Sequence, residues 1–337
     1  MIKKISFEDK IFVAGAKGMA GSAICRELSK RGFSNKNTHR NVLFTPNRSE
    51  LNCLNSEDVE NWFKKHNPSI VIIAAAKVGG IKANMSQPYD FLIENLKIQN
   101  NLIENSFKFG VRRLLFLGSS CIYPKSSSQP IKEEFLLSNY LEKTNEAYAI
   151  AKIAGIKLCE SLRYQKDFDA ICLMPTNLYG TGDNYHQTNS HVLPALIRRF
   201  HEAKINKRSL VTCWGSGNPY REFMHADDLG SACVYALDNW YPDHINSPKD
   251  INGNPLCYLN VGTGKDIQIK ELALRIANLL GYEGEIKWDT TKPDGTYKKL
   301  LDVSRINSIG WESSISLNQG LKQTIQDFIL LGEKNRL

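Results

Sequence analysis

Five continuous apolar runs, separated by amphipathic stretches such as SAICRELSKRG and SEDVENWFKKH, dominate the first half of the chain. Amphipathic stretches are typical of helices with one buried face, whereas strands buried on both faces are apolar throughout. The pattern therefore predicts repeated βα units and a right-handed, doubly wound parallel sheet of the α/β class. The expected strands are KIFVA (10–14), NVLFT (41–45), SIVIIAAA (69–76), RLLFLG (113–118) and AICLMP (170–175).

Two longer helices are predicted in the same half. Residues 89–109 carry apolar side chains near helical spacing. Residues 146–164 follow Thr144, a candidate N-cap, and begin with Glu146, which interacts favourably with the helix dipole. The length of both helices suits a dimer interface as well as core packing, and both interpretations stay open.

The regular alternation ends after Pro175. Turn-rich stretches follow, among them LYGTGDNYHQTNSH, WGSGNPYREF and KPDGTYKK, with helices scattered between them. We expect a first domain over residues 1–176 and a smaller α/β lobe, which binds the substrate, over residues 177–330. The stretch HADDLGSACVYAL, in a segment near 222–240, is expected to return to the first domain.

The composition excludes several classes of protein. The chain has 337 residues, of which 42% are apolar and 23% charged, and its net charge of +8 is spread along the sequence. Because no basic stripe with interleaved aromatics is present, no nucleic-acid partner is expected. No apolar run approaches the roughly 18–20 residues that span a bilayer, and IFVAGA is too short for a signal peptide, so no membrane partner is expected.

Eight cysteines are scattered along the chain without a CxxC pair. Several lie in apolar segments, as in SAICREL and LVTCW, where a thiol behaves as a small buried hydrophobe. A disulfide framework is therefore not expected, no metal site is predicted, and a reducing cytoplasm is the expected compartment.

A glycine-rich loop, GAKGMAG, lies directly between the first predicted strand and the first predicted helix. Its glycines Gly15, Gly18 and Gly21 form a GxxGxxG variant of the dinucleotide fingerprint. They permit a tight turn, a close approach of the backbone to a diphosphate, and close packing of helix on strand. This position in a βαβ unit indicates a Rossmann-type nucleotide-binding domain.

The region after the second strand indicates which dinucleotide is bound. NAD-binding domains usually end this strand with an acidic residue that hydrogen-bonds the ribose, but NVLFT is followed by PNRSE. Arg48 follows the strand closely and Lys17 lies in the glycine loop, and both could pair with a 2′-phosphate. We therefore predict NADP(H), while an ordinary surface position for Arg48 is the alternative.

A second motif, EAYAIAKIAG, places Tyr148 and Lys152 four residues apart. On a helix the two share a face, so the ammonium is expected to lower the pKa of the phenol from its usual value of about 10. Together with Ser119 at the end of the fourth strand, they predict a reductase. Ser119 is expected to hydrogen-bond a substrate carbonyl, Tyr148 to protonate its oxygen, and Lys152 also to hold the nicotinamide ribose.

At this point the sequence resembles the extended short-chain dehydrogenases/reductases and, within them, the GDP-L-fucose synthase family. The resemblance covers nearly the whole chain, through GAKGMAGSAI, AAAKVGGI, LGSSCIYPK, TNEAYAIAKIAGIKLCES, MPTNLYG, NSHVLPALIRRFHEA, WGSG, REFMHADD, NVGTG and KPDGTYKKLLDV. It implies C3/C5 epimerisation of GDP-4-keto-6-deoxy-D-mannose, followed by NADPH-dependent reduction of the C4 ketone to give GDP-L-fucose.

The resemblance also implies an acid–base pair for the epimerisation. The C4 ketone acidifies the hydrogens on C3 and C5, and each inversion needs a base on one face and an acid on the other. Cys121, directly after two serines, matches the family's base, and His191 in NSHV matches its acid. Without the motifs, a lone cysteine is usually inert packing and a lone histidine is usually solvated. His186 is the competing histidine.

Further contacts are carried over from the family, position by position. Arg198 and Arg199 are adjacent on a predicted helix and cannot both face the site, and the choice of Arg199 follows the family match. Residues matching positions at the substrate are Asn177, Arg199, Trp214, Arg221 and Lys292. Residues expected at the cofactor, besides those named above, are Met19, Ala75, Pro175, Asn177, Leu178 and His191.

Three alternatives are weighed against this interpretation. Sugar-nucleotide 4,6-dehydratases have an acidic pair just after the serine, where this chain has Cys121 and Ile122. A GDP-colitose synthase-type enzyme needs only C5 epimerisation and reduction and could keep the same residues. A non-catalytic NADP-binding protein on the same fold typically loses the tyrosine or the lysine. The expected partners are a GDP-sugar and a second copy of the chain in a homodimer.

Overall fold

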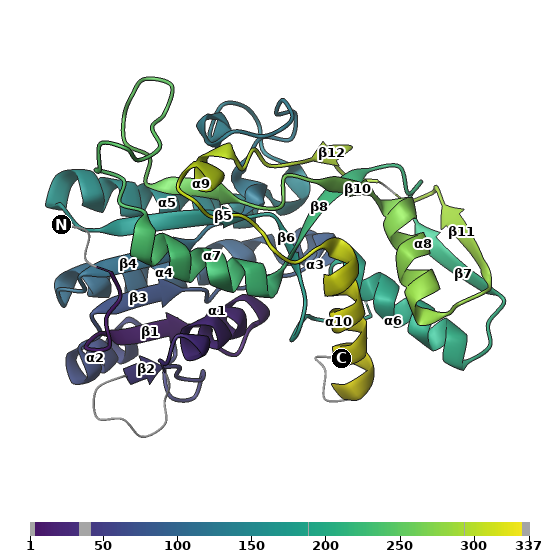
Figure 1. Ribbon diagram of the computed structural model, residues 1–337, viewed down its shortest axis with the longest axis horizontal. Helices are drawn as coiled ribbons and strands as arrows, with labels where there is room; N and C mark the ends of the chain where they lie inside the picture. Colours follow the sequence, from purple (N-terminus) through teal and green to yellow (C-terminus); the bar gives the residue numbers. More distant parts are fainter. Residues whose placement is uncertain (1–3, 34–41, 188, 293, 332–337) are drawn as a thin grey trace.

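The computed structural model describes residues 4–33, 42–187, 189–292 and 294–331. A six-stranded sheet, in which every neighbouring pair is parallel, forms the larger part of the molecule (Figure 1). Its order is β2-β1-β3-β4-β5-β9. The strands are β1 (Lys10–Ala14), β2 (Val42–Phe44), β3 (Ile70–Ile73), β4 (Arg113–Leu117), β5 (Ala170–Pro175) and β9 (Tyr258–Val261).

This arrangement confirms the predicted doubly wound parallel sheet. The five expected strands are all present, with Asn41 of the second lying outside the described residues. The sixth strand, β9, was not predicted, because its four residues lie among turn-rich segments. Apart from exposed Lys10, the side chains of β1, β3, β4 and β5 are buried on both faces, which explains their continuous apolar sequences.

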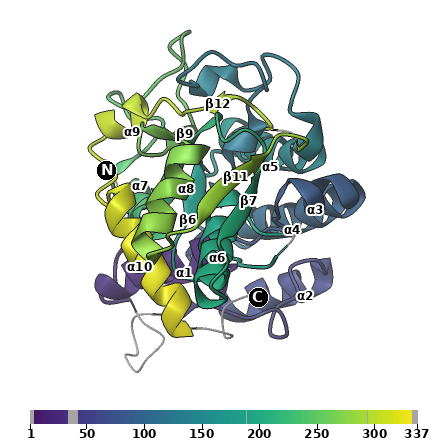
Figure 2. The ribbon, with the colours of Figure 1, turned by 90° about the vertical axis from the view of Figure 1, so that its right-hand side faces the viewer.

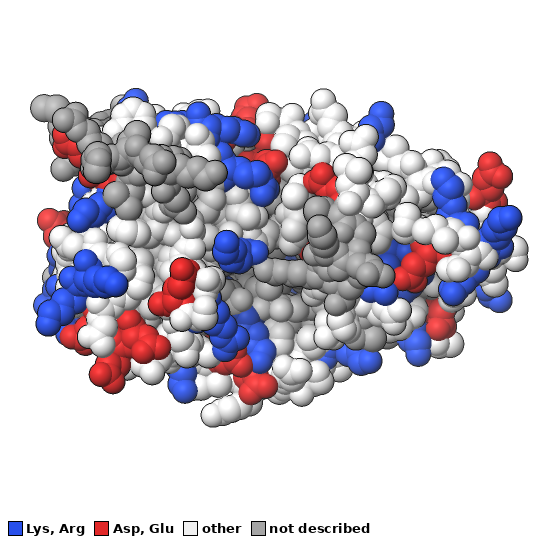
Figure 3. All heavy atoms as spheres, turned by 90° about the horizontal axis from the view of Figure 1, so that it is seen from below, with Lys and Arg blue, Asp and Glu red and all other residues white. Residues whose placement is uncertain are grey.

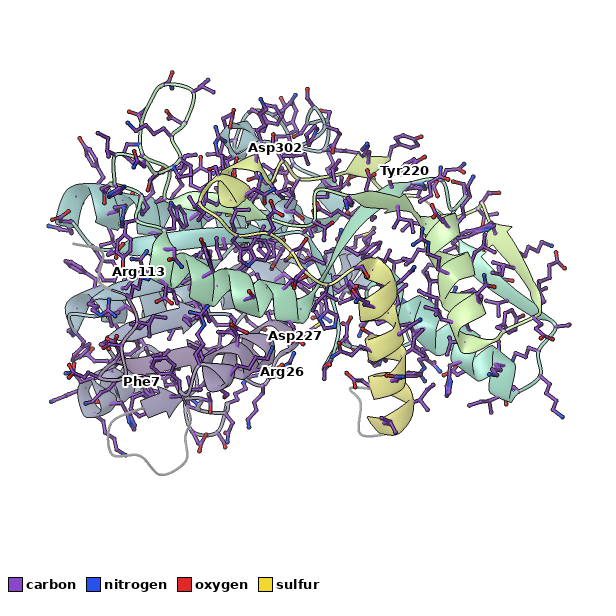
Figure 4. All side chains as sticks on the ribbon, in the orientation of Figure 1. Phe7, Arg26, Arg113, Tyr220, Asp227 and Asp302 are labelled. Atoms are coloured by element: carbon purple, nitrogen blue, oxygen red, sulfur yellow. The ribbon has the colours of Figure 1, made fainter. Side chains whose placement is uncertain are left out.

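Helices cover both faces of the sheet and bury two apolar cores. One face carries α1 (Met19–Lys30) and α7 (Ala226–Asn239), and the other carries α2 (Ser56–His66), α4 (Pro88–Lys108) and α5 (Glu146–Lys166). The stretch HADDLGSACVYAL thus supplies α7, which packs along α1. A partly buried ion pair between Arg26 and Asp227 joins these two helices (Figure 4).

The helix α5 begins at Glu146 as predicted, but its N-cap is not the expected residue. Thr144 was the candidate N-cap, but Lys143–Asn145 form a short 3-10 turn, η3, so that the α-helix begins at Glu146 with Asn145 as its N-cap. The predicted helix is otherwise present and continues to Lys166. This one-residue difference matters below, because the side chain of Asn145 faces the candidate active site.

Most of the remaining elements form a smaller lobe beside the sheet, seen at the right of Figure 1 and facing the viewer in Figure 2. In one of its sheets β8 (Tyr220–His225) pairs with β6 (Asn177–Tyr179), β10 (Asp266–Gln268) and β12 (Lys298–Lys299). In the other, β7 (Leu210–Trp214) pairs with β11 (Glu285–Asp289). The lobe's helices are α6 (Val192–Ile205), α8 (Ile269–Leu280) and α10 (Leu317–Leu331).

Short helices complete the chain and shape the loops of the site. They are α3 (Ile81–Ser86), α9 (Ser304–Ser308), and the 3-10 helices η1 (Ser120–Ile122) and η2 (Glu133–Phe135). On the face shown in Figure 3, basic and acidic side chains are interspersed rather than separated. Within the described residues, no helix has both the length and the apolar sequence needed to cross a membrane.

Candidate active site

The site lies where the strand order of the large sheet reverses. β1 is flanked by β2 on one side and β3 on the other, and ligands of doubly wound sheets bind outside the carboxyl ends of strands at such a point. Gly15 follows β1 with a φ of +84°, and a Cβ there would lie 2.6 Å from the backbone nitrogen of Ala75. Only glycine fits, and the loops after β1 and β3 are in close contact.

The rest of the glycine loop leaves the first turn of α1 accessible to an anion. Gly18 is the N-cap of α1, without a capping side chain, and Met19 is its first residue. The first turn holds no acidic residue that would oppose an anion's charge. A Cβ on Gly21 would lie 2.2 Å from the carbonyl oxygen of Gly15, so the helix can approach the loop only because residue 21 is glycine.

The other residues expected to contact the cofactor lie around this loop, some of them exposed and others on strands. Lys17 and Arg48 are exposed, Lys17 in the glycine loop and Arg48 in the turn that follows β2. Pro175 ends β5, and Leu178 lies in β6 just beyond it. Between them, the amide nitrogen of Asn177 donates to the backbone carbonyl of Glu222 at 2.8 Å.

A tight turn at the carboxyl end of β4 presents the candidate catalytic serine and cysteine. Ser119 is the N-cap of η1, and its Oγ accepts a hydrogen bond from the backbone N–H of Cys121 at 3.2 Å. This contact fixes the turn, so the two side chains are held near one another by local structure. Cys121 is partly exposed, whereas Ser120 and Ile122 on either side are buried.

The tyrosine and lysine of YxxxK project from α5 toward this turn. Desolvation raises the pKa of Tyr148 above its ordinary value; the nearby Cys121 adds to the rise, and hydrogen bonding with Ser119 opposes it. The expectation that Lys152 lowers the pKa of Tyr148 is therefore wrong. The Nζ of Lys152 lies 5.9 Å from the tyrosine ring centre and donates to the carbonyl oxygen of Leu117 at 2.8 Å.

Lys152 is itself perturbed by its position. The residue is buried, with Nζ 4.7 Å from the ring centre of Phe116, and burial lowers its pKa to about 8. Burial disfavours the ammonium form because the charge loses its hydration. The lysine can therefore change protonation state near physiological pH, and Tyr148 is neutral and able to donate a proton.

The sulfur of Cys121 has polar neighbours from two further elements. The Nδ2 of Asn145, directly before α5, donates a hydrogen bond to Sγ at 3.1 Å. Arg221 of β8 interacts electrostatically with Cys121 and with Asp294, while burial lowers the pKa of the guanidinium. The structure thus brings together Ser119, Cys121 and Tyr148 with Arg221 of the smaller lobe.

His191 lies on a loop held by the segment that follows β3. It is the N-cap of α6 and its side chain remains accessible to solvent, while the surrounding protein lowers its pKa by desolvation. The N–H of Gly80 donates to the carbonyl oxygen of Asn189 at 3.2 Å, and a Cβ on Gly80 would lie 2.9 Å from the oxygen of Ser190. His186 is exposed at the preceding turn.

The other candidate substrate residues of the smaller lobe lie around β7. Lys292 lies over the exposed ring of Trp214, with Nζ 5.9 Å from the ring centre, so these two residues form one surface. Arg199 donates to the carbonyl oxygen of Thr212 on β7 at 2.8 Å, on the strand that ends at Trp214. Arg198 faces elsewhere and bonds the carbonyl oxygen of Tyr185.

Sequence reasoning missed two residues of this region. Asn145 was not predicted, although TNEAYAIAK places it three positions before the tyrosine. Glu222 is fully buried, and its carboxylate accepts from the backbone N–H groups of Thr263, Gly264 and Leu301. Its partners lie 41 to 79 residues away in the chain, so no local pattern indicates them.

Comparison with known proteins places these features in context. The model of the NAD dependent epimerase/dehydratase family matches residues 11–252. A putative GDP-L-fucose synthase 2 of Arabidopsis thaliana is 51% identical, covering 95% of this chain and 92% of the relative. The GDP-L-fucose synthase of Escherichia coli K12 is 48% identical, covering 96% of this chain and 97% of the relative. A GDP-L-colitose synthase of Yersinia pseudotuberculosis is 37% identical, covering 97% of this chain and 99% of the relative.

Solved structures agree with this relationship. The GDP-mannoheptose C4 reductase of Campylobacter jejuni, with NADP bound, has a TM-score of 0.83 and 37% identity, covering 96% of this chain and 99% of the other. A GDP-L-fucose synthetase of Naegleria fowleri, bound to NADP, has a TM-score of 0.85 and covers 99% of this chain and 98% of its own. At 23% identity, the second likeness supports the fold alone.

Proposed function

The chain belongs to the NAD dependent epimerase/dehydratase family, and from this premise we propose that it is an NADPH-dependent GDP-L-fucose synthase. The proposed reaction inverts C3 and C5 of GDP-4-keto-6-deoxy-D-mannose and then reduces the C4 ketone. One observation carries the proposal: the Cys121 thiol lies beside Ser119 and Tyr148 at the end of β4. A reductase without epimerase activity has no need of a base at this position.

The residues present fit a nicotinamide dinucleotide. The missing side chains of Gly15 and Gly21 leave the backbone loop in close contact with its neighbours, and the first turn of α1 is free of acidic residues. Residues 15–21 would hold the diphosphate against the helix N-terminus. Lys17 and Arg48 would pair with a 2′-phosphate, which favours NADP over NAD. When bound as NADPH, the cofactor supplies the hydride for C4.

Ser119 and Tyr148 provide a single oxyanion site for all three chemical steps. Both hydroxyls can donate to the C4 oxygen, which becomes negative during each proton abstraction and again during hydride addition. With its pKa raised by desolvation, Tyr148 holds its proton firmly until the alkoxide at C4 requires it. The same donors thereby lower the barrier to enolate formation at C3 and at C5.

Cys121 and His191 are the proposed acid–base pair. The thiolate takes the proton from the sugar carbon, the C–H electrons form the enolate, and the imidazolium returns a proton to the opposite face. The lowered pKa of His191 makes its ring mostly neutral near pH 7, so it must first take up a proton. The proton held by Cys121 then returns to solvent, which restores both groups.

Cations of the smaller lobe are proposed to bind the GDP portion of the substrate. Arg221 lies near Cys121, so a diphosphate bound by its guanidinium would place the attached sugar near the thiol. Lys292 and Trp214 together offer a charge and a flat aromatic face, which suit a phosphate and a purine respectively. Asn177 and Arg199 complete the proposed substrate set.

The proposal is tested by incubating the protein with NADPH and GDP-4-keto-6-deoxy-D-mannose and analysing the product by NMR. Consumption of NADPH with formation of GDP-L-fucose is the expected result. Turnover of the 3-deoxy analogue alone would instead favour a GDP-colitose synthase, a second candidate supported by the 37% identical relative. NADPH binding without turnover of either ketone would point to a non-catalytic protein.

We also propose that the enzyme acts as a homodimer in the cytoplasm. Large side chains stay exposed on the two adjacent helices α4 and α5, namely Tyr89, Phe107, Ile150 and Tyr164. All eight cysteines are free thiols, which suits a reducing compartment. Sedimentation of the purified protein tests the dimer, and a mass equal to one chain at micromolar concentration would refute it.

A further inference from the structure

Asn145 does not behave as an asparagine at the start of a helix usually does. In that position the side-chain oxygen normally accepts a hydrogen bond from the second or third residue of the helix. Asn145 is the N-cap of α5 but makes no such capping bond. Its Nδ2 instead donates to the Sγ of Cys121 at 3.1 Å. The helix forgoes a local stabilising contact in favour of one with a distant sulfur.

Local stability does not explain the orientation of the Asn145 side chain, as the surroundings of its amide oxygen show. The Oδ1 of Asn145 is buried and has no hydrogen-bond partner among the residues that the structure describes. An unsatisfied buried acceptor lowers stability, and the missing cap lowers it further. Positions at which a residue departs from such local rules are characteristic of functional sites.

The contact with Cys121 favours one protonation state of the sulfur. An N–H donor forms a stronger hydrogen bond with an anionic acceptor than with a neutral one. The guanidinium of Arg221, which interacts electrostatically with Cys121, acts in the same direction. An amide donor at the end of η3 and a guanidinium on β8 thus both act on this thiol.

We propose that Asn145 is a positioning residue for epimerisation, and that its side-chain amide orients the sulfur of Cys121 and stabilises the thiolate when it forms. This inference rests on the proposed function, because it takes Cys121 as the base. Asn145 keeps both of its amide protons throughout. The proton that moves passes from the sugar carbon to the sulfur, and the hydrogen bond from Nδ2 weakens when the sulfur becomes neutral.

The first test measures the thiolate directly and needs no substrate. In the full-length protein, alkylation of Cys121 by iodoacetamide is followed as a function of pH by peptide mass spectrometry. In Asn145→Ala and Asn145→Ser we expect the alkylation rate at pH 7 to fall about tenfold, with the profile moving to higher pH. Cys25 and Cys53 serve as internal references, because burial raises the pKa of both thiols to about 11.

A second measurement separates this role from a structural one. Serine can cap α5, so Asn145→Ser should melt at or above the parental temperature. We nevertheless expect a roughly tenfold slower incorporation of solvent deuterium at C3 and C5 of GDP-4-keto-6-deoxy-D-mannose, since the thiolate fraction falls in proportion. Asn139→Ala, an exposed asparagine six residues earlier in the chain, is the matched control and should leave both measurements unchanged.

The outcomes distinguish this inference from the proposed function. Parental alkylation profiles and parental deuterium incorporation in both Asn145 variants would overturn the inference. A Cys121→Ser variant that incorporates deuterium at the parental rate would refute Cys121 as the base, and the role of Asn145 in epimerisation with it. If Cys121 is not the base, a shifted alkylation profile in the Asn145 variants would still show that the Asn145 amide stabilises the thiolate.

Discussion

At the scale of single residues, the site depends on burial more than on direct pairing of charges. Lys152 and Tyr148 share a helix face as the YxxxK spacing predicts, yet the lysine bonds a backbone carbonyl and the tyrosine pKa rises. Spacing fixes which side chains are neighbours, because helical geometry is local. It does not give the desolvation of each group, which depends on the packing of distant elements around it.

The buried lysine predicts an alkaline limit for activity. Its pKa of about 8 lies below the ordinary value of 10.5, so the ammonium needed at the nicotinamide ribose is lost above pH 8. We expect kcat/KM for NADPH to fall about tenfold per pH unit beyond that point. A pH profile from 6 to 10 checks this, and a flat profile up to pH 10 would contradict it.

Deprotonation of Lys152 does not itself destabilise the folded chain. Between pH 8 and 10.5 the unfolded chain holds the Lys152 proton that the folded chain has released. Stability therefore rises with pH across this window as far as this lysine contributes. A thermal melt at each pH is the control for the activity profile, and a melting temperature that falls in parallel with kcat/KM would point to another cause.

At the scale of elements, the segment after β3 connects the two proposed acid–base residues. α3 packs against η3, which leads into Asn145, and Gly80 at the start of α3 contacts the loop that carries His191. Gly79 lies against Phe91, whose ring packs edge-on against Tyr148 with centres 6.4 Å apart. One short segment thereby touches neighbours of every proposed proton-transfer group.

This arrangement makes Gly80→Ala a test of the loop. The added Cβ would lie 2.9 Å from the oxygen of Ser190 and must displace the loop before His191. Because small displacements of a reacting group are costly, we expect deuterium incorporation into the ketone to fall about tenfold to a hundredfold, with NADPH affinity unchanged. Lys82→Ala, an exposed position on α3, is the control. Full incorporation in Gly80→Ala would show that this contact does not position His191.

The elements also show which parts of the fold can be predicted from the sequence. The five strands and both long helices follow from periodicity, because burial on one or two faces leaves a repeating pattern. β9 and the pairing of the smaller lobe's strands were not predicted, since their partners lie far away in the chain. Likewise, Cys121 was found from its motif, but its hydrogen bond with Asn145 spans 24 residues and has no local signal.

At the scale of the whole molecule, the buried carboxylate of Glu222 links the large sheet, the β8 sheet and the site. Glu222 lies on β8 of the smaller lobe, and its Oε1 accepts from Thr263 and Gly264, which follow β9 of the large sheet. Its Oε2 accepts from the N–H of Leu301 at 3.0 Å. The neighbouring residue on β8 is Arg221, so this carboxylate also fixes the strand that presents the guanidinium to Cys121.

Glu222→Gln is expected to weaken the molecule as a whole. The amide retains one acceptor but turns an NH₂ group toward backbone donors, which leaves buried groups unpaired. We expect the free energy of unfolding in urea to fall by about 1–3 kcal/mol and KM for the GDP-sugar to rise. Glu271→Gln removes an exposed ion pair with Arg275 and should cost less than about 1 kcal/mol. Equal stability of the two variants would refute this role for Glu222.

The central claim, that one pocket epimerises and then reduces its substrate with Cys121 as the base, has a direct test. The protein is incubated with GDP-4-keto-6-deoxy-D-mannose and NADPH in D₂O, and the product is examined by NMR. We predict GDP-L-fucose with deuterium at C3 and C5 and hydrogen at C4, and loss of that labelling in Cys121→Ser. A reduced product that keeps its original hydrogens at C3 and C5 would contradict the account.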